Sequence, residues 1–444
     1  MKEILACSGA FLIALSLPRQ GLATAWEAGL VGERSAAMAN AYAAVADTPE
    51  CFHANPAGLA TIRQTLSVSM GLHMPTLLEF SFKDARTDTT YRSSQDLVAP
   101  HVFAVGRWGR WALGLGYTVP IGGGGQSFKA MSLFDDPGQL SSAAIRILVH
   151  NLAPSLSVRV HDTLYLGASF NTYLSETAIS LQGYPYEGYP IDIDTQGKGT
   201  AFGTTVGVLF KEPWWGKLSF GFTYKMGYST RAAGKTDFDI QSPVARSLLS
   251  ALGLELPARQ FPSTIEIRIP QMLVAGVAAQ LTPRWLIAFD YQYSMWGESE
   301  HIVLDFGDEV PTAVEDTGLL SNQIQIATGY RHASQFKLGT EWKLTPAIPL
   351  RAGLMYQESA KKVFSNSPVG IDSNAFLITY GSGYGWHWGQ TALSLDLTVY
   401  HYLGLPSRVT EKALGAHQEY WGPAGTYNKS VTFGFLAGAT VYTL

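Results

Sequence analysis

Single charged side chains stand between apolar neighbours in the C-terminal half of the chain. Lys337 and Arg351 are two of them, and Asp290, Glu341 and Asp396 occupy equivalent positions. A buried cation can bind an anionic group of a ligand, because an unpaired charge away from water is costly. It can equally form an ion pair with Glu341 or Asp290 that braces the protein. Both roles stay open for Lys337 and Arg351.

Catalytic chemistry has little support in the sequence. The chain has ten histidines but no G-x-S-x-G motif. His161 and His387 fall in turns, apart from any loop serine. No paired C-x-x-C or H-E-x-x-H occurs, and Gly122–Gly125 lacks the Lys-Ser/Thr ending of a phosphate-binding loop. We predict no catalytic residue, metal or cofactor, with a Ser-His-acid hydrolase as a weaker alternative.

The charged residues belong to segments in which side chains alternate with a period of two. From Trp285 to Tyr293, the odd-numbered positions are aromatic or aliphatic, whereas the even-numbered ones include Asp290 and Gln292. Residues 350–357 and 393–399 repeat the pattern. One face of such strands suits lipid and the other a lumen, and amphipathic helices do not give this period.

Fourteen segments of this kind follow one another from residue 64 to the C-terminus. They predict an all-β fold, a 14-stranded antiparallel transmembrane β-barrel; a soluble β-sandwich explains any single strand as well. A Lys or Arg facing the membrane midplane costs roughly 2 to 4 kcal/mol, so the charged strand residues, Lys343 included, should point inward. The predicted strands are 65–82, 97–107, 110–119, 152–161, 163–176, 200–210, 217–229, 264–281, 284–306, 322–344, 349–358, 374–384, 389–402 and 429–443.

Composition and the first residues point to an exported protein. The chain of 444 residues is 46% hydrophobic and 15% charged with a net charge of −4, which gives no basic excess for nucleic acid. Residues 1–25 resemble a signal peptide, with cleavage after Ala25; a lipidated Cys7 is a weaker alternative. Cleavage leaves Cys51 without a disulfide partner. No later apolar stretch reaches roughly 18 residues, which excludes a helical inner-membrane protein.

The lengths of the connections predict how the barrel is oriented in the membrane. Short turns alternate with long loops, so the short turns and both chain ends should face the periplasm. The last strand should pair with the first, because every backbone group facing lipid needs a partner. Residues 26–62 lack the period of two, precede the barrel of residues 63–444 and are too short for a separate domain.

Two long loops carry further signals. Pro120 and the following Gly122–Gly125 should weaken the ladder at the end of the third strand, as a kink or gap in the wall. Leu140, Ala144, Ile147 and Leu148 share one helical face in the same connection, and Val244, Leu248, Leu249 and Leu252 share another in the fourth long loop. Two apolar helices outside the cell predict a ligand groove, or they simply pack on the loop bases.

Several segments together resemble the FadL/TodX family of outer-membrane transporters for long-chain fatty acids and other hydrophobic compounds. These segments span the mature chain: Ala46-Asp47 through Asn55-Pro56-Ala57-Gly58, Pro270 through Trp296, Phe336–Trp342 with Leu350–Gly353, and Leu393–Tyr400. The C-terminal Tyr442-Thr443-Leu444 departs from the aromatic ending common in barrel assembly signals.

The resemblance implies particular roles for residues. Asp47, Asn55, Pro56, Ala57 and Gly58 would belong to an N-terminal hatch that plugs the lumen. A kink in the third strand would open a lateral exit at Gly114, Gly116, Pro120 and Gly122. Trp26 would contact the ligand, and the apolar loop leucines, Leu148 among them, would form the outer groove.

We therefore predict passive uptake of hydrophobic compounds such as long-chain fatty acids across the outer membrane of a Gram-negative bacterium. Alternatives are aromatic hydrocarbons as substrates, a plugged hydrophilic porin, and a structural or adhesive barrel. The expected partners are the ligand, outer-membrane lipid and lipopolysaccharide, and the barrel-assembly machinery, with no nucleic acid and a monomeric protein. An apolar ligand needs no energy input, because each methylene transferred from water into lipid gains about 0.8 kcal/mol.

Overall fold

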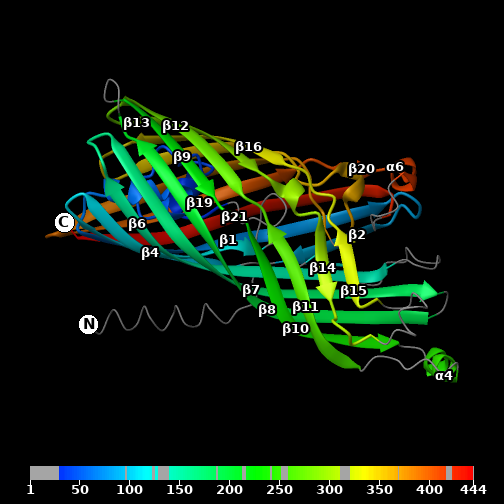
Figure 1. Cartoon of the computed structure of the whole chain (residues 1–444). Helices are drawn as coiled ribbons and strands as arrows, with labels where there is room; N and C mark the ends of the chain where they lie inside the picture. The colour runs from blue at the N-terminus through cyan, green and yellow to red at the C-terminus, as the bar shows by residue number, and fades with distance from the viewer. Residues whose placement is uncertain are drawn as a thin grey trace.

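The computed structural model describes residues 30–95, 98–122, 126–128, 140–186, 189–212, 217–240, 243–251, 259–310, 321–368, 370–416 and 423–443. Fourteen antiparallel strands close into a barrel (Figure 1), as the sequence predicted. They are β1 (Leu66–Asp84), β3 (Ala99–Trp108), β4 (Trp111–Gly122), β6 (Leu140–Arg159), β7 (Leu164–Tyr186), β8 (Tyr189–Phe210), β9 (Leu218–Lys225), β12 (Met272–Thr282), β13 (Trp285–Ser294), β16 (Ala333–Lys343), β17 (Pro349–Gln357), β18 (Ala375–Trp388), β19 (Thr391–Gly404) and β21 (Gly425–Thr443).

Pairing between the first and last strands closes the barrel. β1 and β21 run side by side from Leu66 opposite Thr443 to Asp84 opposite Gly425. Closure gives each of the fourteen barrel strands a neighbour on both sides, which is the condition for a sheet in lipid. Connections such as 109–110 between β3 and β4 are short at one end, here called the short-turn end, and long at the other, the long-loop end.

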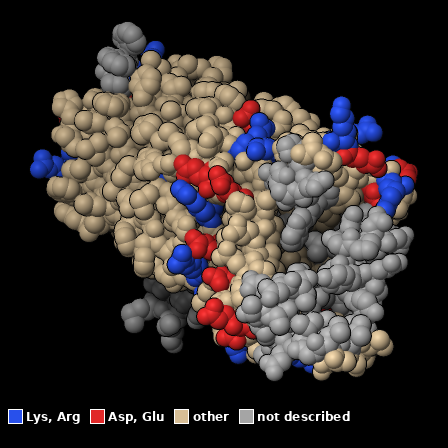
Figure 2. Space-filling model, turned by 45° about the vertical axis from the view of Figure 1, so that its right-hand side comes forward, with Lys and Arg blue, Asp and Glu red and all other residues tan. Residues whose placement is uncertain are grey.

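Side chains alternate between the outside of the barrel and its lumen. On β13, Trp285 and Phe289 are 44% and 41% exposed, whereas Ala288 and Asp290 are buried. Charged residues gather toward the long-loop end, and the wall beside it is a broad uncharged surface (Figure 2). The predicted inward charges Lys337, Glu341 and Arg351 are buried. Lys343 ends β16 and is exposed at the turn, where no lipid forces it inward.

Exposed tryptophans mark the short-turn end. Trp108 and Trp111 flank the β3–β4 turn, Trp285 and Trp342 lie on neighbouring strands, and Trp388 is 84% exposed. Such a ring of indoles is typical of the interface between hydrocarbon and head groups. Among the described residues, no helix is long and apolar enough to cross a membrane.

The long-loop end carries additional short elements. The strands are β2 (Thr90–Gln95), β5 (Gln126–Phe128), β10 (Tyr228–Ile240), β11 (Gln260–Ile269), β14 (His301–Asp305), β15 (Gln323–Ala327) and β20 (Ser407–Val409). The helices are α4 (Pro243–Ala251), α6 (Glu411–Gly415) and the 3₁₀ turns η2 (Trp296–Glu298) and η3 (Val363–Ser365).

Three predicted strands are each broken in two. The segment 264–281 becomes β11 and β12, which separate at Pro270, where the chain lacks an N–H for the ladder. Segment 284–306 is interrupted by η2, and 322–344 by residues 328–332. In each case the outer piece turns to another neighbour: β11 pairs with β10 and β14, whereas β12 pairs with β9 and β13.

The predicted helix containing Leu148 is wrong. Residues 140–159 form the single strand β6, whose pairing with β7 runs from Leu140 opposite Gly183 to Arg159 opposite Tyr165. Ile145, Ile147 and Val149 are all buried, with the period of a strand. These β-branched residues favour strand over helix, and they outweigh the helical spacing of the leucines.

Residues 30–62, here called the inner segment, lie inside the barrel (Figure 1). They contain α2 (Glu33–Ala37), α3 (Cys51–Ala54) and η1 (Pro56–Thr61). Almost every side chain is buried, many of them alanines. Small side chains let this backbone approach the strands closely, and its polar groups then bond to wall residues.

Candidate functional site

Asn55 holds the inner segment to itself and to the wall. Its side chain accepts a hydrogen bond from the Ala57 N–H (3.1 Å) and caps η1. Its amide donates to the Ala43 carbonyl (2.9 Å) and to the Val208 carbonyl on β8 (3.0 Å). A buried side chain with all these bonds fixes both the conformation of the turn and its position against the wall.

The other residues of the predicted hatch signature lie in η1. Pro56 begins the turn, where its missing N–H costs nothing. Ala57 accepts a hydrogen bond at its carbonyl from Ser157 of β6 (2.8 Å). Gly58 lies against Ala46, whose carbonyl oxygen would be 2.2 Å from an added Cβ. The signature residues therefore form one packed unit against the wall; their gating role stays a prediction.

An ion-pair chain joins the inner segment to three strands. Arg34 of α2 contacts Asp47 (2.6 Å) and Glu341 of β16 (2.7 Å). Glu341 also pairs with Arg351 of β17 (2.7 Å), which reaches Asp396 of β19 (2.5 Å). Each charge thus has an opposite neighbour, as buried charges require.

Asp47 is held in its charged form. Burial alone would raise the pKa of this carboxyl, but Arg34 and then Lys211, 3.8 Å away, lower it to about 2. Tyr42 also donates a hydrogen bond to Asp47 (3.1 Å). The predicted hatch residue is therefore an anchor for Arg34.

Arg351 occupies the ion-pair role that the sequence left open. Its guanidinium donates to Glu341 and Asp396, two residues from the start of β17 at the short-turn end. It does not line any of the three cavities described below. Binding of a ligand by Arg351 remains a prediction, which would require these bonds to rearrange.

Asp290 of β13 binds backbone rather than a lysine. Its Oδ2 accepts hydrogen bonds from the N–H groups of Tyr42 and Ala43, both at 2.8 Å. Gly276 on the neighbouring strand leaves room for this carboxylate, since an added Cβ would lie 2.2 Å from Oδ1. Asp290 is therefore a wall anchor for the middle of the inner segment.

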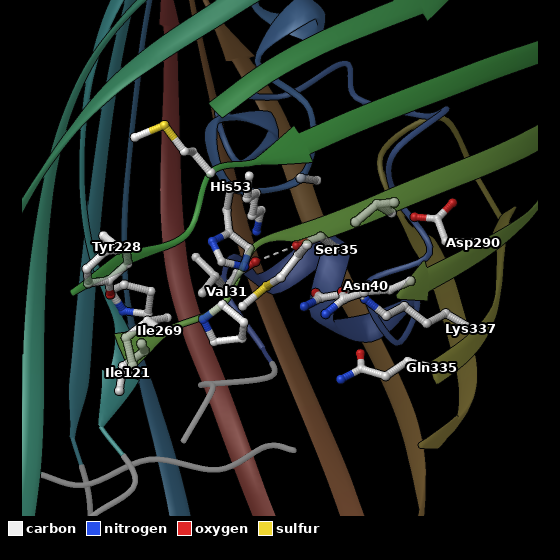
Figure 3. A pocket seen from close by; sticks show the side chains of 18 of the residues that line it. Val31, Ser35, Asn40, His53, Ile121, Tyr228, Ile269, Asp290, Gln335 and Lys337 are labelled. Carbon is white, nitrogen blue, oxygen red and sulfur yellow. Dashed lines mark hydrogen bonds between the residues drawn. The ribbon is translucent and has the colours of Figure 1, made fainter. Parts of the chain in front are cut away.

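The main cavity lies between the inner segment and the wall (Figure 3), with a volume of about 90 Å³. Val31, Asn40 and His53 line it from the inner segment. Its strand lining combines apolar side chains with a few polar ones: Ile121, Tyr173, Tyr228, Ile269, Met272, Val274, Lys225, Asp290, Gln292, Gln335 and Lys337. Lys337 is thus at the cavity, as its inward parity predicted, and donates a hydrogen bond to Gln292 (2.7 Å).

His53 is neutral in this environment. Burial lowers the pKa of its imidazole well below the usual value, and the positive charges of Lys225 and Lys337 lower it further. Two lysines therefore lie near an uncharged ring, in a cavity lined by apolar side chains together with a few polar ones. Such a site suits an apolar molecule that carries an anionic group.

A second cavity of about 50 Å³ adjoins the wall at β4. His53, Pro120, Tyr173 and Lys225 line both cavities. The β4–β6 ladder is irregular here, since the pairing breaks between Thr118 and Ile121, around Pro120. The kink predicted from Pro120 therefore exists and lies beside the lumen cavity. Gly122 follows it and pairs with Leu148.

Gly114 and Gly116 of β4 make room for the inner segment. An added Cβ at Gly114 would be 2.2 Å from Cζ of Phe52, and at Gly116 it would be 3.0 Å from Cδ1 of the same ring. Phe52 stacks on Phe103 of β3, with ring centroids 5.5 Å apart. In this structure these predicted lateral-opening residues form a recess that Phe52 fills; their part in an exit stays a prediction.

The remaining predicted ligand contacts are spread apart. Leu148 is buried against Ala99 and Val119 on the wall, next to the β4 kink. The predicted helix in the fourth long loop is present as α4, where Val244 is 69% exposed. Leu248 and Leu249 belong to α4 as well, and no contact of theirs is described. Leu252 and Trp26 lie outside the described residues.

Several site residues were not predicted from the sequence. Arg34, Phe52 and His53 have no strand period or motif that marks them. Lys225 sits at the end of β9 among polar residues, and its alternation with Thr223 was the available signal. The inner-segment residues could only be found from the fold, because their partners are distant in sequence.

Comparisons with known proteins agree with this architecture. The family model for "Outer membrane protein transport protein (OMPP1/FadL/TodX)" matches residues 19–441. The fold is similar to a FadL homologue from Pseudomonas aeruginosa, with a TM-score of 0.75, 15% identity, and 94% of this chain and 99% of the other covered. It is also similar to the toluene transporters TodX of P. putida (TM-score 0.67, 15% identity) and TbuX of Ralstonia pickettii (0.63, 16%), each with the same coverage. No curated protein matches the sequence significantly.

Proposed function

The chain belongs to the OMPP1/FadL/TodX family of outer membrane proteins that transport hydrophobic compounds, and from this premise we propose that its substrates are acyl carboxylates such as long-chain fatty acids. The observation that carries this proposal is the main cavity, where apolar walls meet Lys337 and Lys225. An uncharged hydrocarbon has no use for buried cations, whereas a carboxylate does.

Buried apolar side chains between the long-loop end and this cavity support an entry of the substrate from that end. A continuous cluster of buried apolar side chains extends from the outer strands to the cavity wall: Ile145, Ile147, Val149, Ile179, Phe238, Ile240, Phe261, Ile265, Ile267, Ile269, Leu304 and Phe306 among them. A sixteen-carbon chain gains on the order of 12 kcal/mol on leaving water, at about 0.8 kcal/mol per methylene. Uptake down a gradient then requires no other energy source.

The acid would place its head group between the two lysines. Asp290 also lines the cavity, and its single negative charge is outnumbered by the two lysines. His53 adds no charge, since its pKa is lowered. The local charge of the cavity is therefore positive overall, and it would attract a carboxylate.

The inner segment would act as a hatch that directs the substrate sideways. Its ion pair with β16 and its bonds to β8 and β13 support this role, because they tie the segment to the wall on several sides. The second cavity lies next to the break in the β4–β6 ladder around Pro120. We propose that the substrate leaves through the wall at this break, into membrane lipid.

Uptake of palmitate and toluene by cells that depend on this protein tests the substrate class. Lys337→Met keeps the length and apolar stem of the side chain, and it should lower palmitate uptake about tenfold while sparing toluene, since a charge-assisted bond is lost. Lys198→Met is the matched control, because Lys198 is exposed and pairs with Glu176 at the long-loop end. Equal losses of both substrates, in protein that folds normally, would overturn the carboxylate assignment.

Aromatic hydrocarbons are the second candidate. The stacked rings of Tyr173 and Tyr228, with centroids 3.8 Å apart, line the cavity and suit a flat ligand. Two of the similar structures are of toluene transporters, at 15% and 16% identity. Normal palmitate uptake by Lys337→Met with toluene as the better substrate would favour this candidate.

A hydrophilic porin makes a different prediction for the inner segment. Deleting residues 30–62 should open a large aqueous conductance in planar bilayers if these residues close the lumen. Unchanged conductance after deletion, in a barrel that retains heat-modifiable migration, would contradict the hatch.

A further inference from the structure

A third cavity lies on the outer side of the barrel at the long-loop end, with a volume of about 410 Å³. The loop between β17 and β18 supplies Lys362 and Ser373 to its lining, and Arg331 and Arg408 come from neighbouring connections. It shares no lining residue with the two lumen cavities. The transport route described above does not use it.

Neighbouring residues show which way the cavity opens. Phe376 of β18 pairs with Leu403 of β19, and both are exposed on the outer face of the wall (38% and 47%). Asn374 and Leu405, which line the cavity, are each two residues further along the same face, and the Leu405 N–H bonds to the Asn374 carbonyl (2.7 Å). The cavity therefore lies directly beyond the apolar outer wall.

The cavity is strongly basic. Arg331, Lys362 and Arg408 are exposed, and no carboxylate of the described residues lies within 4.0 Å of their charged nitrogens. Lys361 lies beneath them, buried, with its Nζ bonded to the carbonyls of Ser365 (2.8 Å) and Gly370 (2.9 Å). Arg331 also donates from Nε to the Ser359 carbonyl (3.1 Å). Three exposed cations that line one cavity favour a bound anion.

A buried hydroxyl also points to a polar ligand. Ser373 is 2% exposed and lines the cavity, yet its Oγ has no hydrogen-bond partner among the described residues. A buried polar group without a partner is unfavourable, so a ligand that accepts its proton would stabilise it. Two guanidinium groups and a hydroxyl are the groups that bind phosphate oxygens well.

We propose that this cavity binds a phosphate group of an outer-leaflet lipid. The lipid source follows from the apolar surface at the opening, where Val363 and Leu405 are 54% and 43% exposed and continue into Phe376 and Leu403. Acyl chains would lie against this surface while the phosphate enters the basic cavity. The inference rests on the location of the barrel in the outer membrane, and it does not depend on the transported substrate.

Native mass spectrometry of the purified full chain in detergent, with EDTA present, tests the proposal. The probes are bisphosphorylated lipid A, the same lipid A with both phosphates removed, and inorganic phosphate as a competitor. Bisphosphorylated lipid A should bind at least about tenfold more tightly than the dephosphorylated form, and millimolar phosphate should displace little of it. Equal binding of the two lipids, or full displacement by phosphate, would overturn the lipid-phosphate site.

Two double variants locate the site. R331Q/R408Q should lose this preference, whereas K198Q/R231Q removes two exposed cations of the same loop end, which pair with Glu176 and Glu266, and should keep it. Equal losses in both would assign the effect to general surface charge and refute the site. Lys337→Met should retain lipid A even if its palmitate uptake falls, so that a failure of the substrate proposal leaves this result unaffected.

Discussion

Arg34 of the inner segment and Glu341 of β16 form a two-pronged ion pair, although 307 positions separate them in the sequence. Nε of Arg34 lies 2.7 Å from Oε2 of Glu341, and Nη2 lies 3.1 Å from Oε1. Planar guanidinium and carboxylate groups match in this geometry, which fixes orientation as well as distance. The pair therefore sets how the inner segment sits in the barrel.

Removing one partner should loosen the inner segment without unfolding the barrel. Arg34→Gln leaves Glu341 partly unpaired and is expected to cost about 3 kcal/mol of docking free energy, since a broken buried pair is strongly destabilising. Cys51 reports this change, because it is fully buried in α3 and burial raises the pKa of its thiol. Maleimide labelling of Cys51 should accelerate roughly a hundredfold.

Arg268→Gln provides the control for that variant. Arg268 pairs with Glu298 at 3.2 Å, outside the lumen and more than half exposed. Its loss should leave the labelling rate of Cys51 unchanged, because exposed pairs contribute little. If Cys51 is labelled as slowly in Arg34→Gln as in the unaltered protein, the ion pair does not hold the inner segment.

Arg351 allows a direct choice between ion pairing and ligand binding. Since it bonds to Glu341 and Asp396, Arg351→Ala should disturb the seat of Arg34 and change the uptake of palmitate and toluene by similar factors. Transport assays with both compounds, together with Cys51 labelling, check this. Selective loss of palmitate with unchanged labelling would instead assign a carboxylate to Arg351.

Glu50 should make the docking of the inner segment depend on pH. Burial raises the pKa of its carboxyl to about 7, and Glu33 and Asp396 add to this, while N–H groups of Ser35 (2.9 Å) and Arg34 (3.2 Å) oppose it. His101 is a basic group beside this acid pair, with its Nε2 3.2 Å from an oxygen of Glu33. The docked state binds more protons than the undocked one, so docking is strongest below the ordinary glutamate pKa and weakens as pH rises to about 7.

Single-channel recordings at pH 5.5 and pH 8 check this dependence. Openings should be more frequent at pH 8, and Glu50→Gln should remove most of the difference, because the amide keeps an acceptor for the N–H groups and carries no charge. If Glu50→Gln shows the same pH response as the unaltered protein, another group governs it.

The barrel could be predicted from the sequence because each strand shows the alternation of apolar and polar side chains within its own residues. Trp285 and Asp290 alternate sides for a local reason, namely that lipid and lumen select different side chains. Pro120 likewise predicted the break in the β4–β6 ladder, since proline has no N–H to donate to a ladder.

The inner segment and the long loops depend on distant contacts instead. Arg34 gives no local sign that it meets Glu341, and Phe52 gives none that it fills the space over Gly114. Residues 140–148 were misassigned because their leucine spacing fits a helix, whereas pairing with β7 decides the outcome. Lys337 and Arg351 both occupy positions that the strand pattern predicts to face the lumen. Only their neighbours in the fold show that Lys337 lines the cavity and that Arg351 forms ion pairs.

The contact between Gly114 and Phe52 offers a test by two linked substitutions. Gly114→Ala would place a methyl carbon only 2.2 Å from Cζ of Phe52, so the ring must move. Overpacking of this kind costs typically 1–3 kcal/mol, and Cys51, next to Phe52 in the chain, should be labelled faster. Gly106→Ala on β3 is the control, because an added Cβ there meets nothing within 4 Å.

Phe52→Leu should then reduce the penalty of Gly114→Ala, because a shorter side chain leaves space for the methyl group. In the double variant, labelling of Cys51 should return most of the way to the rate of Phe52→Leu alone, which gives a coupling free energy of at least about 1 kcal/mol. Additive effects would mean that the two residues do not touch in the membrane. A positive coupling would show that Phe52 of the inner segment docks in the recess over the glycines of β4. Any opening at Pro120 would then require Phe52 to leave that recess.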